Sequence, residues 1–499
     1  MAEGGDALKI DIETRTRTGD DLLEACRALL GKECVLTGTS MDRYLEDWTG
    51  RFSVASQNRP HAVLRPGSTT EVAEAVRLCA AHDVAVVPQG GRTGLCGGAL
   101  PVPGHPCVIL TLDRMAAIRQ IDTDARTLTV EAGTILETAQ DVARDSGLVF
   151  PLTFGAQGSC MIGGALATNA GGSNVVRYGN TRDLCLGIEA VLADGSIVSN
   201  LDGLHKDNTG YDLRHLLIGS EGTLGIITAA VFRLAPEPCV RAAGFFAMAR
   251  LDDAAEVLNQ LQDCTGGAVE AFEFMSDRAV EVICRAFPDI RPPLDSPTPV
   301  GVFFELASSR PSDALPDSDG SPVLHSAVLT ALGTLMDDGI VTDAMIAQSE
   351  QQRLDLWRLR ESVLEAMMHH GPIYPADVSL PVSRIAAFLR CVDPVVQQMG
   401  FTPVTVGHLG DGNLHYALTA APGKDWTALP LDAARTVILD ALAELGGSFS
   451  AEHGIGQDKL DAMRRHKQPA QLAALRAIKA ALDPAGILNP GKLLPSPPA

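Results

Sequence analysis

Two histidines in one short stretch of the chain could hold a metal ion. The segment VTVGHLGDGNLHYALT, residues 404–419, is typical of two strands around a Gly-Asp-Gly turn. His408 would end the first strand and His415 would lie on the second, with six residues between them. A short hairpin brings both imidazoles to one side, at the separation that a metal ion needs. Because a satisfied structural histidine is the commoner case, the pair alone indicates a metal only weakly.

A third candidate ligand stands in SAEHGIGQDK, residues 450–459, where Glu452 precedes His453. Two histidines and a carboxylate with open positions suit Zn²⁺, Mn²⁺ or Fe²⁺ acting as a Lewis acid. Adjacent residues of an extended segment point in opposite directions, so we expect Glu452 and His453 not to share one ligand role. That leaves His453 available as a base.

Two glycine-rich stretches could cradle a phosphate-bearing cofactor. VVPQGGRTGLCGGA (86–99) follows a predicted strand, and FGAQGSCMIGGALATNAGG (154–172) repeats the pattern. Glycine lets successive backbone N–H groups converge on an anion, although tight turns in a strand-rich fold are the plainer interpretation of either stretch alone. Neither stretch fits the nicotinamide-dinucleotide fingerprint or the phosphate-binding loop of nucleotidases. Together they favour an extended dinucleotide held by another fold.

The elements that must position these residues alternate between strands and helices. Predicted strands include HAVLRP, CVILTL and TLTVEAG, and STTEVAEAVRLCAAHD reads as a helix capped by threonine. LGIEAVLADGSIV is typical of a hairpin, and DDLLEACRALLG and QPAQLAALRAIKAALDP of helices near the two ends. The pattern predicts an α+β architecture in two parts.

Composition excludes several classes of protein. The chain has 499 residues, 46% of them hydrophobic and 20% charged, which is ordinary globular usage and excludes wholesale disorder. A net charge of −21 argues against nucleic acid or an anionic membrane as the main partner. No stretch is long and apolar enough for a membrane span, and the first residues suit neither a secretory nor a mitochondrial leader. Eleven scattered cysteines without a CxxC pair indicate reduced thiols, so we expect a cytoplasmic protein.

Three motifs in residues 60–235 resemble the flavin domain of the vanillyl-alcohol oxidase / p-cresol methylhydroxylase family. They are the first glycine stretch, GSCMIGGALATNAGGSNVVRYGNTRD, and KDNTGYDLRHLLIGSEGTLGIITAAVFRL, in the family's order. The resemblance implies FAD, bound noncovalently because Arg92 and Thr93 stand where some members attach the flavin through a histidine. The residues implied to contact FAD are Pro88, Gly90, Gly91, Arg92, Thr93, Gly94, Leu95, Gly158, Ser159, Gly163, Thr168, Asn169, Gly171, Glu221, Ile226 and Asn489.

GHLGDGNLH, AEHGIG and the terminal ILNPGKLLP resemble the FAD-linked D-2-hydroxyacid dehydrogenases of that family, which include D-lactate, D-2-hydroxyglutarate and glycolate enzymes. The resemblance implies that His408, His415 and Glu452 bind the divalent metal, with Zn²⁺ favoured over Mn²⁺ and Fe²⁺, and that His453 is the base. It implies a two-subdomain FAD-binding fold, an α+β substrate (cap) domain, and a C-terminal segment that returns to the FAD domain. The expected boundaries are a helical segment at 1–55, the FAD domain at 56–236, the substrate and metal domain at 237–445, and the returning segment at 446–499.

The implied reaction oxidises a D-2-hydroxyacid to the 2-oxoacid, with hydride passing from C2 to flavin N5. We expect Arg360 to bind the substrate carboxylate through its guanidinium fork, with His408, Asn413, His415 and His453 also against the substrate. Members specific for hydroxyglutarate carry Thr, Lys and Asn where this chain has Leu364, Pro375 and Ala417. The missing groups would grip a distal carboxylate, so a monocarboxylate such as D-lactate, or a longer one, is favoured over D-2-hydroxyglutarate.

Other readings stay open. A flavoprotein of the same fold could instead be an oxidase that uses O₂ or an alkyl-transfer synthase, and a flavin-carrying electron-transfer subunit would need no metal site. The sequence leaves the electron acceptor open among a quinone, an electron-transfer flavoprotein and a cytochrome. A homodimer is the family expectation.

Overall fold

A four-stranded sheet carries the first glycine stretch. In the computed structural model, which describes residues 19–296 and 298–496, the strand order is β1-β2-β4-β3, and β2, β4 and β3 run parallel. Helix α2 begins after Ser68, whose hydroxyl accepts the N–H of Glu71, so the cap is this serine rather than the predicted threonine. The elements are a helix at 19–30, β1 (Val35–Leu36), β2 (Val63–Leu64), α2 (Thr69–Ala81), β3 (Ala85–Gln89) and β4 (Cys107–Thr111).

A five-stranded antiparallel sheet forms the second half of this N-terminal region, in the order β5-β6-β10-β8-β9. The predicted hairpin around the Asp-Gly turn is β8 and β9. The second glycine stretch contains α4, which packs against β6 and β10 of this sheet. The elements are β5 (Ile118–Asp122), β6 (Thr127–Glu131), α3 (Leu136–Asp145), β7 (Leu148–Val149), α4 (Ile162–Thr168), α5 (Val175–Tyr178), α6 (Thr181–Leu184), β8 (Cys185–Val191), β9 (Ile197–Ser199), α7 (Leu213–Leu217), β10 (Ile226–Arg233) and β11 (Ala235–Pro236).

A seven-stranded antiparallel sheet organises the rest of the chain, in the order β15-β12-β14-β13-β17-β18-β16. The predicted histidine hairpin is confirmed as the neighbouring strands β17 and β18. The strands are β12 (Val240–Met248), β13 (Val269–Met275), β14 (Gly301–Ser308), β15 (Val341–Ile346), β16 (Tyr374–Ser379), β17 (Phe401–His408) and β18 (Asn413–Ala420).

Helices cover both faces of this sheet, and an apolar core lies on each side. One core joins the sheet to α8, α10, α13 and α14, and the other joins it to α9, α11 and α12. Successive residues of a strand face opposite sides, so Phe272 and Phe274 enter the first core and Met275 the second. The helices are α8 (Ala254–Thr265), α9 (Asp277–Ala286), α10 (Val323–Asp337), α11 (Glu350–Glu361), α12 (Val363–His370), α13 (Ile385–Gln398) and α14 (Leu431–Leu445).

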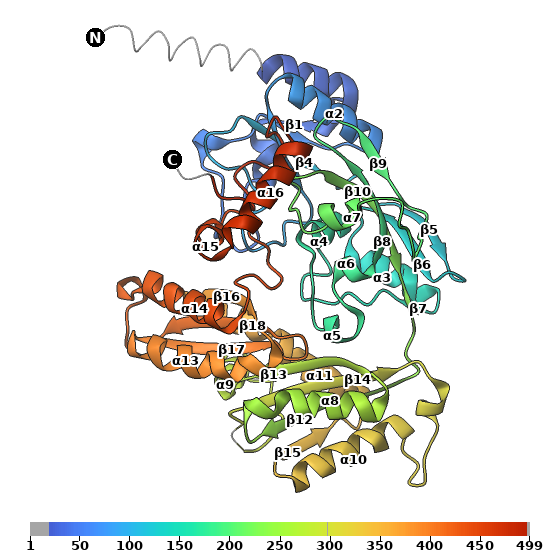
Figure 1. Cartoon of the computed structure of the whole chain (residues 1–499), viewed down its shortest axis with the longest axis vertical. Helices are drawn as coiled ribbons and strands as arrows, with labels where there is room; N and C mark the ends of the chain where they lie inside the picture. Colours follow the sequence, from blue (N-terminus) through green and yellow to red (C-terminus); the bar gives the residue numbers. More distant parts are fainter. Residues whose placement is uncertain (1–18, 297, 497–499) are drawn as a thin grey trace.

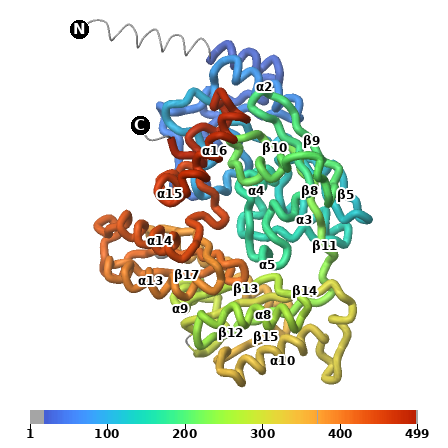
Figure 2. The backbone as a smooth tube through the Cα atoms, in the orientation of Figure 1, coloured from blue at the N-terminus to red at the C-terminus, as the bar shows by residue number. Residues whose placement is uncertain are grey.

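The C-terminal segment crosses from the seven-stranded sheet back to the N-terminal region. After α14 the chain runs into α15 (Leu460–His466) and α16 (Pro469–Leu482), which lie beside the N-terminal sheets (Figures 1 and 2). Leu488 then pairs in parallel with Val86 of β3, and the Asn489 N–H donates to the Val86 carbonyl. The segment after α14 therefore returns from the seven-stranded sheet to the N-terminal region. The mixed sheets and helices confirm the predicted α+β fold.

A buried ion pair joins the two halves at a second place. Arg177 and the Tyr178 hydroxyl, both on α5, bond to the carboxylate of Glu270 on β13 at 2.9 and 2.6 Å.

Among residues 19–296 and 298–496, no helix has the length and apolar character to cross a bilayer. The prediction that the first residues form no leader concerns residues 1–18, outside the described residues.

Candidate active site

The two hairpin histidines lie on one face of the seven-stranded sheet. His415 pairs in register with Val406, two residues before His408, so the two imidazoles are diagonal neighbours on the two strands. Their ring centroids are 5.2 Å apart and the rings are nearly perpendicular. Glu452 reaches the pair from the C-terminal segment, with its Oε1 3.6 Å from His408 Nε2. The three side chains expected to hold a metal are thus neighbours, but His408 is not in the group of potential ligand atoms that all lie within 4.8 Å of one another.

His453 lies at the same place rather than pointing away. Its ring stacks on His415 at a centroid distance of 5.9 Å, and potential ligand atoms of His415, Glu452, His453 and Asp377 all lie within 4.8 Å of one another. The expectation that Glu452 and His453 diverge is wrong, because residues 451–453 form a bend and not an extended strand.

Asp377 on β16 causes that bend. Its Oδ2 accepts the N–H groups of Ala451, Glu452 and His453 at 3.1, 2.9 and 2.9 Å. Its Oδ1 accepts the Nδ2–H of Asn413 at 3.0 Å. Oδ2 is saturated by its three bonds and Oδ1 accepts one, so Asp377 anchors the segment while its carboxylate remains part of the cluster. Asn413 is expected at the substrate, but its amide N–H groups donate to Asp377 and to the Val378 carbonyl.

The cluster carries more negative than positive charge. Burial raises the pKa of Glu452 to about 7. The charge of His408 lowers this pKa, and the neighbouring carboxylates of Asp377 and Asp411 raise it further. Burial likewise raises the pKa of Asp411 to about 6. Burial opposes charge on His408, yet Glu273 and Glu452 raise its pKa to about 9. The raised pKa values of Glu452 and Asp411 show that burial disfavours their negative charge. A divalent cation bound by two imidazoles and a carboxylate would favour that charge, and the residues present are ligands of the right types.

His453 has the properties of a base. Burial lowers the pKa of its imidazole below the ordinary value, with Asp377 opposing the shift and Lys459 adding to it. A neutral ring can accept a proton at neutral pH. The side chain keeps about a fifth of its surface exposed, so a small substrate can reach it.

Arg360 on α11 lies beside the histidines and is almost fully buried, at 7% exposure. Its Nε donates to Glu273 Oε2 at 2.7 Å, and Glu273 also accepts from His408 Nδ1 at 2.8 Å. Within the described residues its Nη2 has no hydrogen-bond partner. An unpaired guanidinium nitrogen beside the candidate metal ligands fits a substrate carboxylate.

The two glycine stretches meet each other and the histidine cluster. A Cβ on Gly91 would overlap the carbonyl oxygen of Ser159, so only glycine allows the two loops to approach this closely. A Cβ on Gly171 would lie 2.9 Å from Glu452 Oε1. The loop expected to hold the cofactor therefore touches the carboxylate expected to hold the metal.

Several buried polar atoms of β3 and of the returning C-terminal segment have no hydrogen-bond partner among the described residues. Gln89 and Asn489 hold the end of the first glycine stretch through their amide N–H groups, at the carbonyls of Ala99 and Gly98, and leave their amide oxygens unpaired. Lys492 is 3% exposed, and its ammonium is unpaired too. Native proteins leave few such atoms unsatisfied. Together with the open space beside Gly94, they fit a polar cofactor such as FAD.

Other residues expected at the cofactor are partly engaged within the protein. Asn169 ends α4 in the left-handed conformation and its Oδ1 accepts the N–H of Arg182. The Glu221 carboxylate accepts the N–H groups of Ile455 and Gly456, both at 2.7 Å. Ile226 is 2% exposed in a hydrophobic core, so the structure does not present it to a cofactor.

The remaining expected residues lie on the two loops. Thr93 accepts a hydrogen bond from the Trp48 indole at its carbonyl, and Arg92 lies over the Tyr44 ring. The others are Pro88 and Gly90 beside the start of the first loop, Leu95 within it, and Gly158, Gly163 and Thr168 on the second loop or α4.

Sequence reasoning missed Asp377, Glu273 and Lys492. Asp377 stands in IYPADVSLP, a segment considered only for Pro375, and Lys492 follows Asn489 by three residues. The partners of Asp377 and Glu273 lie far away along the chain, so the sequence around either acid does not reveal its role.

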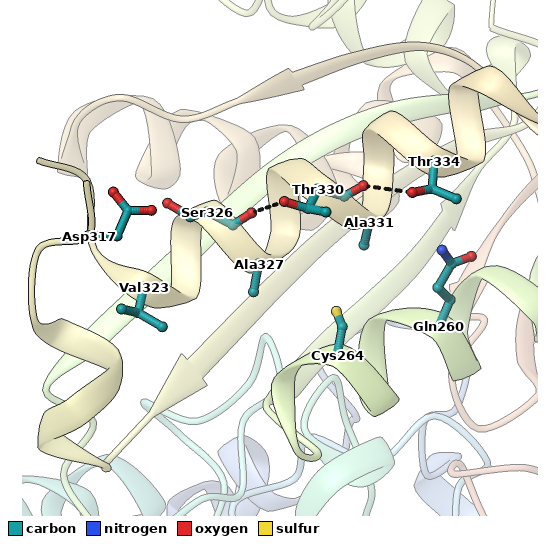
Figure 3. Close-up of a pocket in the computed structure, with 9 residues that line it drawn as sticks. All are labelled: Gln260, Cys264, Asp317, Val323, Ser326, Ala327, Thr330, Ala331 and Thr334. Atoms are coloured by element: carbon teal, nitrogen blue, oxygen red, sulfur yellow. Dashed lines mark hydrogen bonds between the residues drawn. The ribbon is translucent and has the colours of Figure 1, made fainter. Parts of the chain in front are cut away.

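A separate cavity of about 430 Å³ lies between α8 and α10 (Figure 3). Cys264 and Thr330 are among its lining residues. These two helices cover the face of the seven-stranded sheet opposite α11 and Arg360, so the cavity is not part of the histidine site.

Comparison with known proteins agrees with this arrangement. Residues 60–200 match the family described as FAD binding domain, and residues 237–493 match FAD linked oxidases, C-terminal domain. The chain is 39% identical to D-2-hydroxyglutarate dehydrogenase of Xanthomonas citri pv. viticola, covering 91% of this chain and 92% of that protein. It is 38% identical to mitochondrial D-2-hydroxyglutarate dehydrogenase of Bos taurus, covering 87% of this chain and 77% of the relative.

Solved structures show the same fold at low identity. p-Cresol methylhydroxylase with substrate bound has a TM-score of 0.72 at 18% identity and covers 96% of this chain and 97% of its own. An alkyldihydroxyacetonephosphate synthase has a TM-score of 0.70 at 15% identity, covering 94% of this chain and 85% of its own. These likenesses establish the two-subdomain flavoprotein fold of the vanillyl-alcohol oxidase / p-cresol methylhydroxylase type.

Gly91→Ala tests whether the contact between the two glycine loops forms the cofactor cradle. The added Cβ pushes the loops apart, so we expect the purified variant to lose most of its bound FAD, measured as the ratio of flavin to protein absorbance. Gly333→Ala on α10 is the matched control, because within the described residues nothing lies within 4 Å of the new Cβ. Full flavin content in Gly91→Ala would contradict this cradle.

Proposed function

This chain belongs to the FAD-linked D-2-hydroxyacid dehydrogenases of the vanillyl-alcohol oxidase / p-cresol methylhydroxylase family, and from that premise we propose that its oxidation of a D-2-hydroxyacid depends on a divalent metal. His408, His415 and Glu452 would hold the cation, with Zn²⁺ the favoured ion and Mn²⁺ or Fe²⁺ the alternatives. The observation that carries the proposal is the meeting of these three side chains beside Gly171 of the second glycine loop.

Each protein group has a defined task in the proposed reaction. When bound, FAD supplies a two-electron acceptor for hydride and the metal supplies Lewis acidity that lowers the pKa of the substrate hydroxyl. His453 accepts the hydroxyl proton through its neutral imidazole. Arg360 donates from its terminal nitrogens, which are unpaired among the described residues, to the substrate carboxylate and so fixes the position of C2.

D-2-hydroxyglutarate is the first substrate candidate. Relatives named D-2-hydroxyglutarate dehydrogenase match about nine-tenths of the chain at 35–39% identity. This relationship supports that acid over the D-lactate-like substrate that the sequence alone favoured.

A short or apolar D-2-hydroxyacid is the second candidate, because of one specific observation. Leu364 and Ala417 belong to the same apolar cluster, which also contains Val406 and Met367, and Pro375 pairs in register with Ala417. Ala417 thus lies two residues beyond His415 on the same face of β18, Pro375 faces Ala417 across the strand pair, and Leu364 packs on the same apolar cluster as Ala417. A distal carboxylate would lose its hydration there without gaining the Thr, Lys and Asn that hydroxyglutarate-specific members carry at these positions.

The electron acceptor, the oligomeric state and the cellular compartment are also part of the proposal. The acceptor of the electrons from reduced flavin would be an electron-transfer flavoprotein, a quinone or a cytochrome, and the enzyme would be a homodimer. All eleven cysteines lie in the described part of the chain and are unpaired there, which supports a reducing compartment such as the cytoplasm. A flavin-carrying electron-transfer subunit, the alternative of another class, would not need the histidine cluster.

Removal of the metal should stop reduction of the flavin by substrate. We expect an anaerobic D-2-hydroxyacid to bleach the flavin absorbance of the purified protein, and we expect chelator treatment to abolish the bleaching until Zn²⁺ or Mn²⁺ is restored. His415→Ala should behave as the chelated protein does while keeping its FAD. His205→Ala, an exposed histidine on the N-terminal half, is the matched control. Unchanged bleaching after chelation, with metal content shown to be zero, would exclude the metal proposal.

The two substrate candidates separate when the three apolar positions are replaced together. In the variant Leu364→Thr, Pro375→Lys and Ala417→Asn, a distal carboxylate gains a cation and two hydrogen-bonding groups. We expect kcat/KM for D-2-hydroxyglutarate relative to D-lactate to rise by about 10-fold or more, since one such interaction is worth about 1.5–3 kcal/mol. If the unaltered enzyme already prefers D-2-hydroxyglutarate and the variant gains nothing, the second candidate is excluded.

A further inference from the structure

Glu273 on β13 is a carboxylate with no exposed surface, and both of its oxygens face functional side chains. His408 Nδ1 lies 2.8 and 2.9 Å from Oε1 and Oε2, and Arg360 Nε lies 2.7 Å from Oε2. A fully buried carboxylate is costly unless it is paired and hydrogen-bonded. These two partners are the cationic groups that satisfy it.

The register of the sheet makes this contact possible. Glu273 pairs with His408 across β13 and β17, so the two side chains project from directly opposite positions on the same face of the sheet. Phe272 and Phe274 point to the other face, where they enter the apolar core under α8 and α10. Glu273 is therefore the residue of β13 that reaches the histidines.

The contact fixes which nitrogen of His408 faces the cluster. A carboxylate can only accept, so Nδ1 of His408 is the donor to Glu273. Nε2 then points to Glu452, with 3.6 Å between Nε2 and Oε1. A carboxylate on the second nitrogen of a metal-binding histidine sets both its tautomer and its ring orientation.

The same carboxylate also orients Arg360. The guanidinium is a rigid plane, so the bond from Nε to Glu273 sets the direction of the whole fork. Within the described part of the chain only Nε of this guanidinium has a hydrogen-bond partner, so both terminal nitrogens, Nη1 and Nη2, are left for a substrate carboxylate. One carboxylate thus holds a candidate metal ligand and the candidate binder of the substrate carboxylate in a fixed relation.

We propose that Glu273 is a positioning residue that couples metal binding to substrate binding, by holding His408 and Arg360 at the same time. The inference rests on the proposed function of His408 and Arg360, and it adds a residue that touches neither the metal nor the substrate. Glu273 acts only through these two side chains.

Two other buried carboxylates of the sheet have a different set of partners. Glu305 on β14 bonds to Arg241, Arg353 and the Trp357 indole. Glu270 bonds to Arg177, Tyr178 and Arg241. These two carboxylates join structural arginines, whereas Glu273 joins an arginine to a histidine of the site. Glu305 is 3% exposed and so provides a matched control for the general cost of losing a buried charge.

Glu273→Gln tests the proposal in the FAD-loaded full chain. Glutamine keeps the shape but removes the negative charge, and its amide nitrogen in the place of Oε1 would face the Nδ1–H of His408, donor against donor. We expect the dissociation constant for Mn²⁺ or Zn²⁺, measured by calorimetric titration without substrate, to rise by about 10- to 100-fold. We also expect KM for the hydroxyacid to rise more than kcat falls. Glu305→Gln should lower the melting temperature while leaving metal affinity and KM within about twofold.

Three outcomes decide the matter. Equal metal affinity and KM in Glu273→Gln and Glu305→Gln would overturn the positioning role. If the glutamine variant does not fold, Glu273→Asp keeps the charge but shortens the reach, and it must show weaker metal binding than the unaltered enzyme for the proposal to stand. If the unaltered enzyme binds no divalent metal, the proposed function fails instead, and the two failures are thereby distinguished.

Discussion

The Asp377 carboxylate is the contact on which the rest of the site depends. It gathers three successive N–H groups of residues 451–453 and so bends the C-terminal segment against the histidine hairpin. Two residues further on, the Glu221 carboxylate, from the N-terminal half, accepts the N–H groups of Ile455 and Gly456. One short segment is thus held by two buried carboxylates, one from each half of the molecule. Because Glu452 lies inside it, the position of the candidate ligand follows from both anchors.

The balance of charge explains why the cluster would require a cation. Glu273, Asp411 and Glu452 all lie around His408, and burial makes their ionisation costly. Arg360 and a protonated His408 offset two of these three negative charges. A dication between the two imidazoles and Glu452 would stabilise the anionic form of the acids. The same cation would lie next to the glycine loop at Gly171, and so next to the place expected for the flavin.

The sequence predicted the parts of the site that depend on local pattern. The Gly-Asp-Gly turn predicted the hairpin of His408 and His415, and the glycine spacing predicted two loops that need close backbone approach. It could not predict Asp377 or Glu273, because a single acid in an apolar strand carries no signal until a partner strand faces it. The divergence expected of Glu452 and His453 was wrong for the same reason: it assumed an extended segment, and the bend comes from a carboxylate 74–76 residues away. The preference among hydroxyacids depends on how three apolar side chains pack, which sequence spacing alone does not determine.

Anomalous diffraction from crystals grown with Zn²⁺ and FAD tests the convergence of His408, His415 and Glu452 most directly. We predict a zinc peak bonded to His408 Nε2, to one ring nitrogen of His415 and to a Glu452 oxygen, each at about 2.0–2.2 Å. Asp377 should remain outside bonding distance, with its bonds to residues 451–453 intact. A zinc peak at another position would contradict the metal-assisted oxidation proposed here. So would clear density for Zn²⁺ and FAD with none of the three side chains bonded to the metal.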